Sequence, residues 1–365
     1  MQASATALPV STAPALDRWI GRTPLHPVID YLLVGGGITI PIFLAIYFFP
    51  SLTAVSAQTS LKAFLVFNGA HFAASAVRLY TKRGAKEEFP FLSWGFPIVC
   101  LVAVAVGLSW PVLGRNLTNL YLSWSPYHYA AQTYGIAVMY AMQSGARLDD
   151  HDKRRIWWVC LVPFLYALVT ANEGGLAWFV SRDSLASVPV LWMVYQAVVA
   201  VLSVGVVTLP LVLFWQLHTM RKKNVPLITL LLQITNGIWW LGTNYLSAWW
   251  WTAMLHSIQY LIIVVVLHVR EQMAVAPATP NPLHRPAFYA TAFYASSFLL
   301  GAILFFGVPA AYVRMGFDST ESYVLFAVII NLHHFIVDGF IWRNRPKAKT
   351  PAPTARHDEI PAIAL

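Results

Sequence analysis

The chain has 365 residues, of which 58% are hydrophobic and only 11% are charged, and its mean hydropathy is +0.60. Soluble domains carry roughly 25% charged residues, so this composition excludes an ordinary soluble domain. The formal net charge is +9. In a soluble protein such a charge would favour nucleic acid as a partner, but here the basic residues lie between apolar runs, a pattern that marks membrane topology.

Runs of about 20 apolar residues, the length that crosses roughly 30 Å of hydrocarbon, follow one another along nearly the whole sequence. They are continuous, whereas the strands of a β-barrel alternate apolar and polar residues. We therefore expect an all-α, polytopic membrane helical bundle of about ten transmembrane helices. The predicted spans are 27–50, 58–80, 92–113, 120–145, 156–172, 188–216, 226–247, 251–270, 287–313 and 322–342.

These spans make residues 26–343 one transmembrane helical domain. Residues 1–25 lack the apolar core and cleavage site of a signal peptide and are predicted to be a cytosolic leader. Residues 344–365 are rich in Pro, Lys and Ala and are predicted to be a disordered cytosolic tail.

The basic residues give the orientation of the predicted spans. With the N-terminus placed in the cytoplasm, 20 of the 24 Lys and Arg residues fall on the cytoplasmic side. The four on the other side are Lys62, Arg115, Arg182 and Arg314. By the positive-inside rule both termini are cytoplasmic, and we expect an integral protein of the bacterial inner membrane, surrounded by membrane lipids.

Five of the eleven histidines lie inside predicted spans, namely His71, His128, His256, His333 and His334. An ionisable side chain in a span costs about 2.5 kcal/mol or more unless it faces the interior and finds a partner. A hydrogen bond to a neighbouring helix explains one such histidine. Five of them on four helices favour a shared metal site, because neutral imidazoles are ligands of Fe, Cu and Zn.

Helical spacing makes each histidine part of a polar stripe, since residues three, four and seven apart share a face. The stripes are Asn68, His71, Ser75 and Arg78; His128 and Gln132; His256 with Gln259 or Tyr260; and Asn331, His334 and Asp338. Asp338 can hold one nitrogen of His334, which fixes the tautomer and makes the other nitrogen a better metal ligand. His333 points about 100° away from that face.

The predicted depths of these histidines differ. At about 1.5 Å per residue, His71 and His334 fall near the middle of their spans and His128 and His256 within the outer third, a mismatch of roughly 10 Å. Either the outer turns sink into a funnel, helped by a late start of the fourth span at Pro126, or there are two polar sites.

Other polar residues have two explanations each. The seventh span carries a face of Gln233, Asn236, Trp240 and Asn244, which either binds a ligand or joins helices. Glu173 is a catalytic acid or, more commonly, a solvated loop carboxylate. Cys100 and Cys160 are expected to be packed and inert, and the glycines at 35–37 to allow close helix packing.

Four short segments carry a family resemblance. They read Asn68-Gly-Ala-His71-Phe, Tyr127-His128-Tyr129, Leu255-His256-Ser257-Ile-Gln-Tyr260 and His333-His334-Phe-Ile-Val-Asp338-Gly-Phe-Ile-Trp-Arg343. In order and content they resemble segments of the Brp/Blh-type membrane dioxygenases, which cleave β-carotene to retinal. Two positions depart from that pattern, because Ser75 stands where the family has Asp and Tyr260 where the family has its second His.

The resemblance implies a non-haem iron held by His71, His128, His256 and His334, with His333 as a substitute ligand. It also implies O2 and a hydrophobic, carotenoid-like substrate that enters from the bilayer. We assign catalytic roles beside the metal to Asp338 and Tyr260. Copper or zinc in place of iron, a bis-histidine haem protein, and a transporter or channel with a path lined by His, Asn and Gln remain the alternatives.

Overall fold

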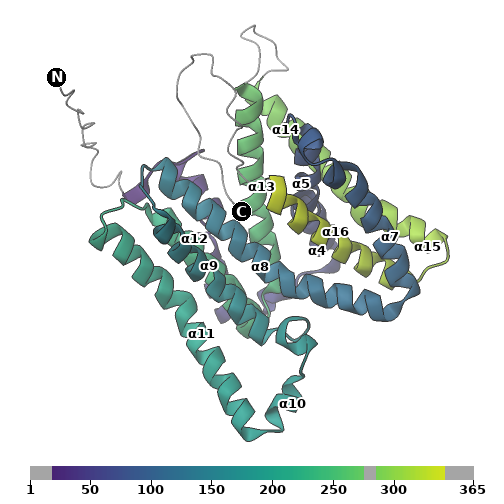
Figure 1. Ribbon diagram of the computed structural model, residues 1–365, viewed down its shortest axis with the longest axis horizontal. Helices are drawn as coiled ribbons and strands as arrows, with labels where there is room; N and C mark the ends of the chain where they lie inside the picture. The colour runs from purple at the N-terminus through teal and green to yellow at the C-terminus, as the bar shows by residue number, and fades with distance from the viewer. Residues whose placement is uncertain (1–18, 275–284, 342–365) are drawn as a thin grey trace.

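The computed structural model describes residues 19–274 and 285–341, and these residues form helices and no strand (Figure 1). The prediction of an all-α protein is therefore confirmed for this part of the chain. The first 18 residues of the predicted leader and the whole predicted tail at 344–365 lie outside the described residues.

The helical elements are α-helices of very different length and short turns of 3-10 or π-helix, which carry the label η. In the first half they are α2 (Pro27–Ile29), η1 (Asp30–Val34), α3 (Thr39–Phe48), η2 (Pro50–Thr53), α4 (Ala57–Ala63), η3 (Phe64–Gly69), α5 (Ala70–Thr81), α6 (Ala85–Glu88), η4 (Phe91–Gly95), α7 (Phe96–Ser109), α8 (Pro111–Gln143) and α9 (Asp150–Thr170). In the second half they are η5 (Gly175–Trp178), α10 (Arg182–Ala186), α11 (Pro189–Trp215), η6 (Gln216–Met220), α12 (Leu227–Leu246), α13 (Trp249–Met273), α14 (Pro286–Ala302), η8 (Ile303–Gly307), α15 (Val308–Arg314) and α16 (Ser319–Ile341).

Among the described residues, six helical runs are long and apolar enough to cross a membrane, and the bent pair α2–η1 with α3 makes a seventh if it is one span. The six are Phe91–Ser109, Asp150–Trp178, Pro189–Met220, Trp249–Met273, Pro286–Arg314 and Ser319–Ile341. These helices fit an integral membrane protein. The predicted spans at 58–80, 120–145 and 226–247 are also helical, but their interior imidazole and amide side chains make them less apolar.

The first predicted span is bent by 45° between Val34 and Thr39. Gly36 lies at the bend with φ of +74°, a backbone conformation that glycine adopts without strain. A Cβ on Gly36 would lie 2.9 Å from Oγ1 of Thr235, so this glycine also lets the bend pack closely against α12. The predicted packing role of the glycine run is confirmed, and the bend is an additional feature.

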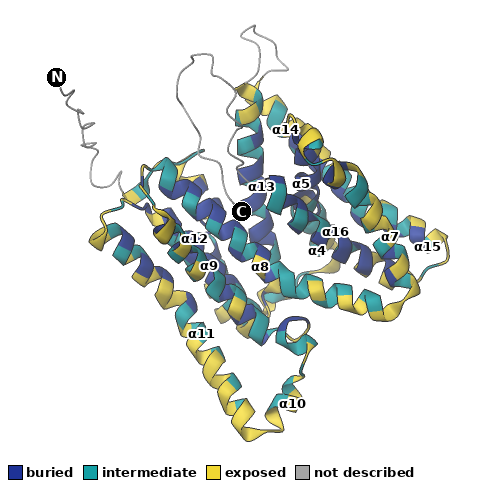
Figure 2. Ribbon diagram, in the orientation of Figure 1, coloured by how far each residue is buried: buried dark blue, intermediate teal, exposed yellow. Residues whose placement is uncertain are grey.

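Helix α13 lies between two groups of helices, with α8, α9, α11 and α12 on one side and α5, α7, α14, α15 and α16 on the other (Figure 1). Helix α8 extends from one group to the other and packs against α7 and α16 as well as α9 and α12. Burial is greatest on α5, α13 and α16, whereas much of α11 is exposed (Figure 2). The centre of the molecule is therefore the place where α5, α8, α13 and α16 meet.

Candidate functional site

Four histidines from these four helices meet in the interior. His71 lies on α5, His128 on α8, His256 on α13 and His334 on α16, and none is more than 6% exposed. The ring centroid of His71 is 4.5 Å from that of His334, 5.0 Å from that of His256 and 6.3 Å from that of His128. The predicted convergence of these four imidazoles is confirmed.

Three of the four form the tightest group. One ring nitrogen from each of His71, His128 and His334 lies within 4.8 Å of the other two. The Nε2 atoms of His128 and His334 are 3.2 Å apart. Both nitrogens of His71 are buried without a hydrogen-bond partner among the described residues. We call His71, His128, His256 and His334 the histidine cluster.

The predicted depth mismatch is resolved in favour of a single site. Helix α8 begins at Pro111, not near residue 120, and its 33 residues continue through Pro126. The expected late start of this helix at Pro126 is therefore wrong, since a proline inside a membrane helix is tolerated where neighbouring groups satisfy the freed backbone. His128 consequently lies near the middle of α8, level with His71 and His334.

Ser75 connects the cluster to the predicted catalytic residues. Its Oγ lies 2.6 Å from Nδ1 of His334, donates a hydrogen bond to Oδ1 of Asp338 at 2.6 Å, and lies 2.9 Å from the hydroxyl of Tyr260. The Tyr260 hydroxyl donates to the same Asp338 oxygen at 2.8 Å. All three residues are buried.

The predicted direct contact between Asp338 and His334 is replaced by this bridge. Nε2 of His334 and Oδ2 of Asp338 are 3.6 Å apart, too far for a hydrogen bond. Ser75 lies on the predicted polar stripe, but no function was predicted for it. Its position four residues after His71, on the same helix face, was the available signal.

The bridge determines which nitrogen of His334 carries the proton. Because the Ser75 hydroxyl donates its only proton to Asp338, its oxygen accepts from Nδ1–H of His334. The Nε2 atom of His334 then has a lone pair, and that lone pair faces His128. This tautomer is assigned from the hydrogen-bond network, and it is the form that binds a metal ion through Nε2.

His333 does not belong to the cluster. Its ring stacks on Phe96, with centroids 5.1 Å apart and planes at 11°. Successive helical residues are about 100° apart, so His333 and His334 cannot face the same point. The prediction that His333 is a metal ligand is therefore wrong for this site.

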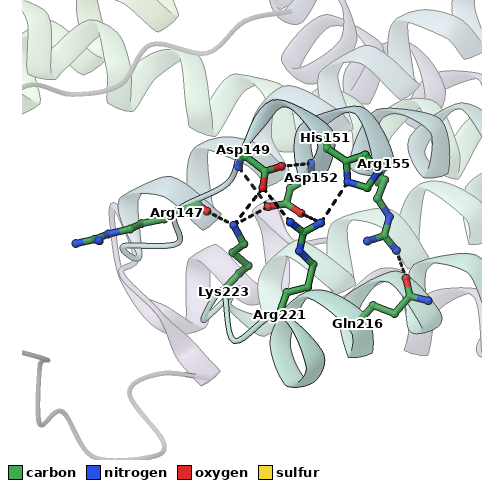
Figure 3. Close-up of polar contacts among 8 residues, drawn as sticks. All are labelled: Arg147, Asp149, His151, Asp152, Arg155, Gln216, Arg221 and Lys223. Atoms are coloured by element: carbon green, nitrogen blue, oxygen red, sulfur yellow. Dashed lines mark hydrogen bonds and ion pairs between the residues drawn. The ribbon is translucent and has the colours of Figure 1, made fainter.

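A second group of potential ligands lies at the N-terminal end of α9, before the predicted span at 156–172 (Figure 3). It consists of Asp149, His151 and Asp152, and basic side chains already occupy it. Arg221 pairs with Asp149 at 2.9 Å and with Asp152 at 2.8 Å, and Lys223 pairs with Asp152 at 3.0 Å. A metal ion would have to displace both cations, so we assign this group as an ion-pair network that ties the start of α9 to the segment before α12.

The same network explains two pKa shifts. The backbone N–H of Asp152 and the neighbouring Arg221 and Lys223 lower the pKa of Asp149 below its usual value. The hydrogen bond to Asp152, together with the charges of both carboxylates, raises the pKa of Lys223. This network was not predicted, because its members come from segments about 70 residues apart in the sequence.

Glu173 lies away from the histidine cluster. It is exposed and lines a cavity of about 730 Å³ together with Arg115, Asn119 and Glu321. No histidine of the cluster lines that cavity. Nothing in this arrangement connects Glu173 with the cluster, which agrees with a solvated loop carboxylate.

Comparison of the chain with protein-family models, with curated proteins and with solved structures found no match. The resemblance to Brp/Blh-type dioxygenases therefore stays a prediction that rests on the four segments quoted above.

Proposed function

We propose that the chain is a membrane-embedded, metal-dependent oxygenase or a related oxidoreductase that acts on a lipid or isoprenoid. The observation that carries the proposal is the set of buried nitrogens contributed by His71, His128 and His334. The Nε2 atoms of His128 and His334 are 3.2 Å apart, which is close to the spacing of neighbouring ligands on one metal ion, given metal–nitrogen distances of about 2.0–2.1 Å.

The donor set favours the metals that imidazole binds. Non-haem iron is our first choice, with copper and zinc as alternatives, because three neutral imidazoles and few nearby charges suit all three. When bound, the metal would supply redox or Lewis-acid chemistry in a site surrounded by apolar helices. Such surroundings suit a hydrophobic substrate from the bilayer, and O2 as oxidant follows from the family resemblance.

The residues beside the cluster have separate tasks in this proposal. Ser75 and Asp338 hold the His334 tautomer that exposes Nε2. The ring centroid of Tyr260 is 4.5 Å from that of His71, and the Tyr260 hydroxyl donates a hydrogen bond to Asp338. Tyr260 is therefore placed to exchange a proton with a group bound at the cluster. His256, with Nε2 unpartnered among the described residues, is the fourth ligand or a contact to the substrate.

A bis-histidine haem fits this geometry less well. Two axial imidazole nitrogens on opposite sides of one iron are about 4 Å apart at ordinary metal–nitrogen distances. The Nε2 atoms of His128 and His334 are only 3.2 Å apart, and the macrocycle would have to pass between them.

A transporter is the second candidate, because one observation favours it. Transporters often have irregular backbone beside their binding sites. In this chain the first span bends after Val34, and the carbonyl of Val34 accepts a hydrogen bond from Gln259 at 2.6 Å. Gln259 in turn contacts Gln132, which lies 3.4 Å from His256. Stoichiometric metal in the purified protein would favour the oxygenase over the transporter.

The proposal includes ten membrane crossings, both termini in the cytoplasm and a location in a bacterial inner membrane. Its support is the distribution of basic residues, since all but four of the 24 fall on one side of the ten predicted spans. Labelling of single cysteines introduced near each terminus, in sealed right-side-out vesicles, tests the orientation. Labelling by an impermeant reagent at either end would contradict it.

Metal analysis tests the function. Wild-type protein purified in detergent is expected to hold about one equivalent of Fe, Cu or Zn, and His71→Ala and His334→Ala to hold little. His333→Ala is the matched control, because it removes the neighbouring histidine that faces Phe96, and it should keep the metal. Less than about half an equivalent in the wild type, or equal loss in all three variants, would defeat the proposal.

A further inference from the structure

Unpartnered polar atoms are concentrated beside the histidine cluster. On α12, the side-chain oxygen of Gln233, both amide atoms of Asn236 and the indole nitrogen of Trp240 are buried without a partner among the described residues. On α8, the side-chain oxygen of Gln132 is also buried without a partner among the described residues. We call Gln132, Gln233, Asn236 and Trp240 the amide band.

The amide band is unusual for a protein interior. Gln233 is 4% exposed and Asn236 0% exposed. Buried side-chain polar atoms nearly always have a partner, because an unmet donor or acceptor in a dry environment loses the hydrogen bond that water would supply. Joining helices, one of the two predicted roles of this face, does not account for Asn236, since neither of its amide atoms contacts a neighbouring helix by a hydrogen bond.

The α12 residues of the band face α8. Residues 233, 236 and 240 share one face of α12, and Thr229 on the same face donates a hydrogen bond to the Ala137 carbonyl of α8 at 3.5 Å. Further along, the ring of Trp240 lies 5.2 Å from that of Tyr129, also on α8. The band therefore lies along the α8–α12 interface.

The amide band adjoins the histidine cluster at His256, which lies 3.4 Å from Gln132, and the ring of Tyr129 lies between Trp240 and His256. Tyr129 stacks on His256, with centroids 3.6 Å apart and planes at 12°. Gln132 donates a hydrogen bond from its Nε2 to Oε1 of Gln259 at 3.0 Å. The unpartnered Oε1 of Gln132 therefore points away from Gln259. His256 is thus the member of the cluster that contacts the band.

The hydrogen-bonding groups of the amide band determine which kind of ligand it can bind. It offers donors (Asn236 Nδ2, Trp240 Nε1) and acceptors (Asn236 Oδ1, Gln233 Oε1, Gln132 Oε1), and α12 contains no Asp, Glu, Lys or Arg. A carboxylate or ammonium would find no opposite charge there. A hydroxyl group is both donor and acceptor, so it can satisfy both kinds of atom.

We propose that the amide band binds the hydroxyl group of a long-chain, otherwise apolar alcohol and so orients the substrate beside the histidine cluster. This inference rests on the proposed function for its biological meaning, because it names the substrate class of that site. The binding itself does not require the metal.

Thermal unfolding of the full-length protein in detergent tests the proposal, because a ligand that binds the folded state raises Tm. The probes are 1-hexadecanol, hexadecane and hexadecyl methyl ether at equal mole fractions in the micelle; the ether retains the acceptor and lacks the donor. The variants are Asn236→Leu and Gln233→Met, which keep side-chain volume. Asn244→Leu is the control, since Asn244 lies on the same helix but has a partner in Tyr166 at 2.7 Å.

Wild type and Asn244→Leu are expected to bind hexadecanol at least about tenfold more tightly than hexadecane, with the ether in between. Asn236→Leu and Gln233→Met should lose most of that preference while they unfold at an unchanged or higher temperature without ligand, because an unmet polar group is removed. Equal binding of alcohol and hydrocarbon by the wild type would overturn the proposal, as would an undiminished preference in both variants.

Metal content, measured on the same preparations, separates the two proposals. Alcohol preference without metal would overturn the oxygenase and leave the band as a hydroxyl site. Metal without alcohol preference would overturn the band and leave the metal site.

Discussion

Replacement of Ser75 by alanine removes one oxygen atom from the centre of the proposed site. That atom bridges Nδ1 of His334 and Oδ1 of Asp338, each at 2.6 Å. In Ser75→Ala the His334 ring loses the acceptor that holds its proton on Nδ1. The tautomer with the proton on Nε2, which cannot bind a metal there, then becomes accessible.

The size of the effect follows from these contacts. Loss of a group that orients a ligating histidine typically lowers metal affinity by about 10- to 100-fold, which corresponds to about 1.4–2.7 kcal/mol. The metal-free protein should also lose about 1–3 kcal/mol of stability, because buried polar partners remain after the hydroxyl has gone. Tyr260 still donates to Asp338 in this variant, so the carboxylate keeps one of its hydrogen bonds.

Competition between the protein and a chromophoric chelator for Zn²⁺ measures the affinity, and Tm without metal reports the stability separately. Ser257→Ala is the matched control, because Ser257 is equally buried but its hydroxyl contacts Asn68 and its own helix. Its Zn²⁺ affinity should stay within about threefold of wild type, because its hydroxyl makes no hydrogen bond to a histidine of the cluster. A folded Ser75→Ala protein with wild-type affinity would refute the bridging role.

Three further predictions concern other parts of the molecule. His333→Ala should lower Tm through loss of its aromatic stacking but leave catalytic turnover intact once a substrate is known, and a loss of turnover would contradict its place outside the site. A Cβ on Gly301 would lie 2.6 Å from the carbonyl oxygen of Gly69, so Gly301→Ala should lower the free energy of unfolding by about 1–3 kcal/mol. Gly307→Ala is the control and should lower it much less, because the nearest atom to a Cβ there is 3.9 Å away. Equal losses of stability in the two variants would contradict close packing at Gly301. The lowered pKa of Asp149 adds stability that is fully present above its unfolded value of about 3.9 and is lost as the pH falls through the folded value; below pH 4, Tm should therefore fall less steeply in Asp149→Asn than in wild type, and parallel curves would contradict this.

Local sequence patterns were sufficient to predict an all-α protein and the faces of the helices that carry the site. The spacing of His71 and Ser75, and of His334 and Asp338, places each pair on one side of its helix whatever the surroundings. The low charge content indicated a membrane protein for a similar reason: the hydrocarbon around the spans requires it, however the helices pack against one another.

The relation between distant helices could not be predicted. Ser75 and Asp338 are 263 residues apart, and their contact depends on how α5 packs against α16, which no local pattern encodes. The depth of His128 was misjudged for a related reason: polar residues after Pro111 resemble a loop by composition, but in the structure they form the first turns of α8. The amide band was recognised as a polar face, but its lack of partners depends on the neighbouring helices.

X-ray absorption at the edge of whichever metal the purified protein contains tests the central claim most directly. The account predicts a first coordination shell with three imidazole nitrogens at about 2.0–2.1 Å, together with the outer-ring scattering that imidazole produces. In His333→Ala, which should keep the metal, the imidazole contribution should be unchanged. A shell made only of oxygen or sulfur, without imidazole scattering in the wild type, would contradict the account.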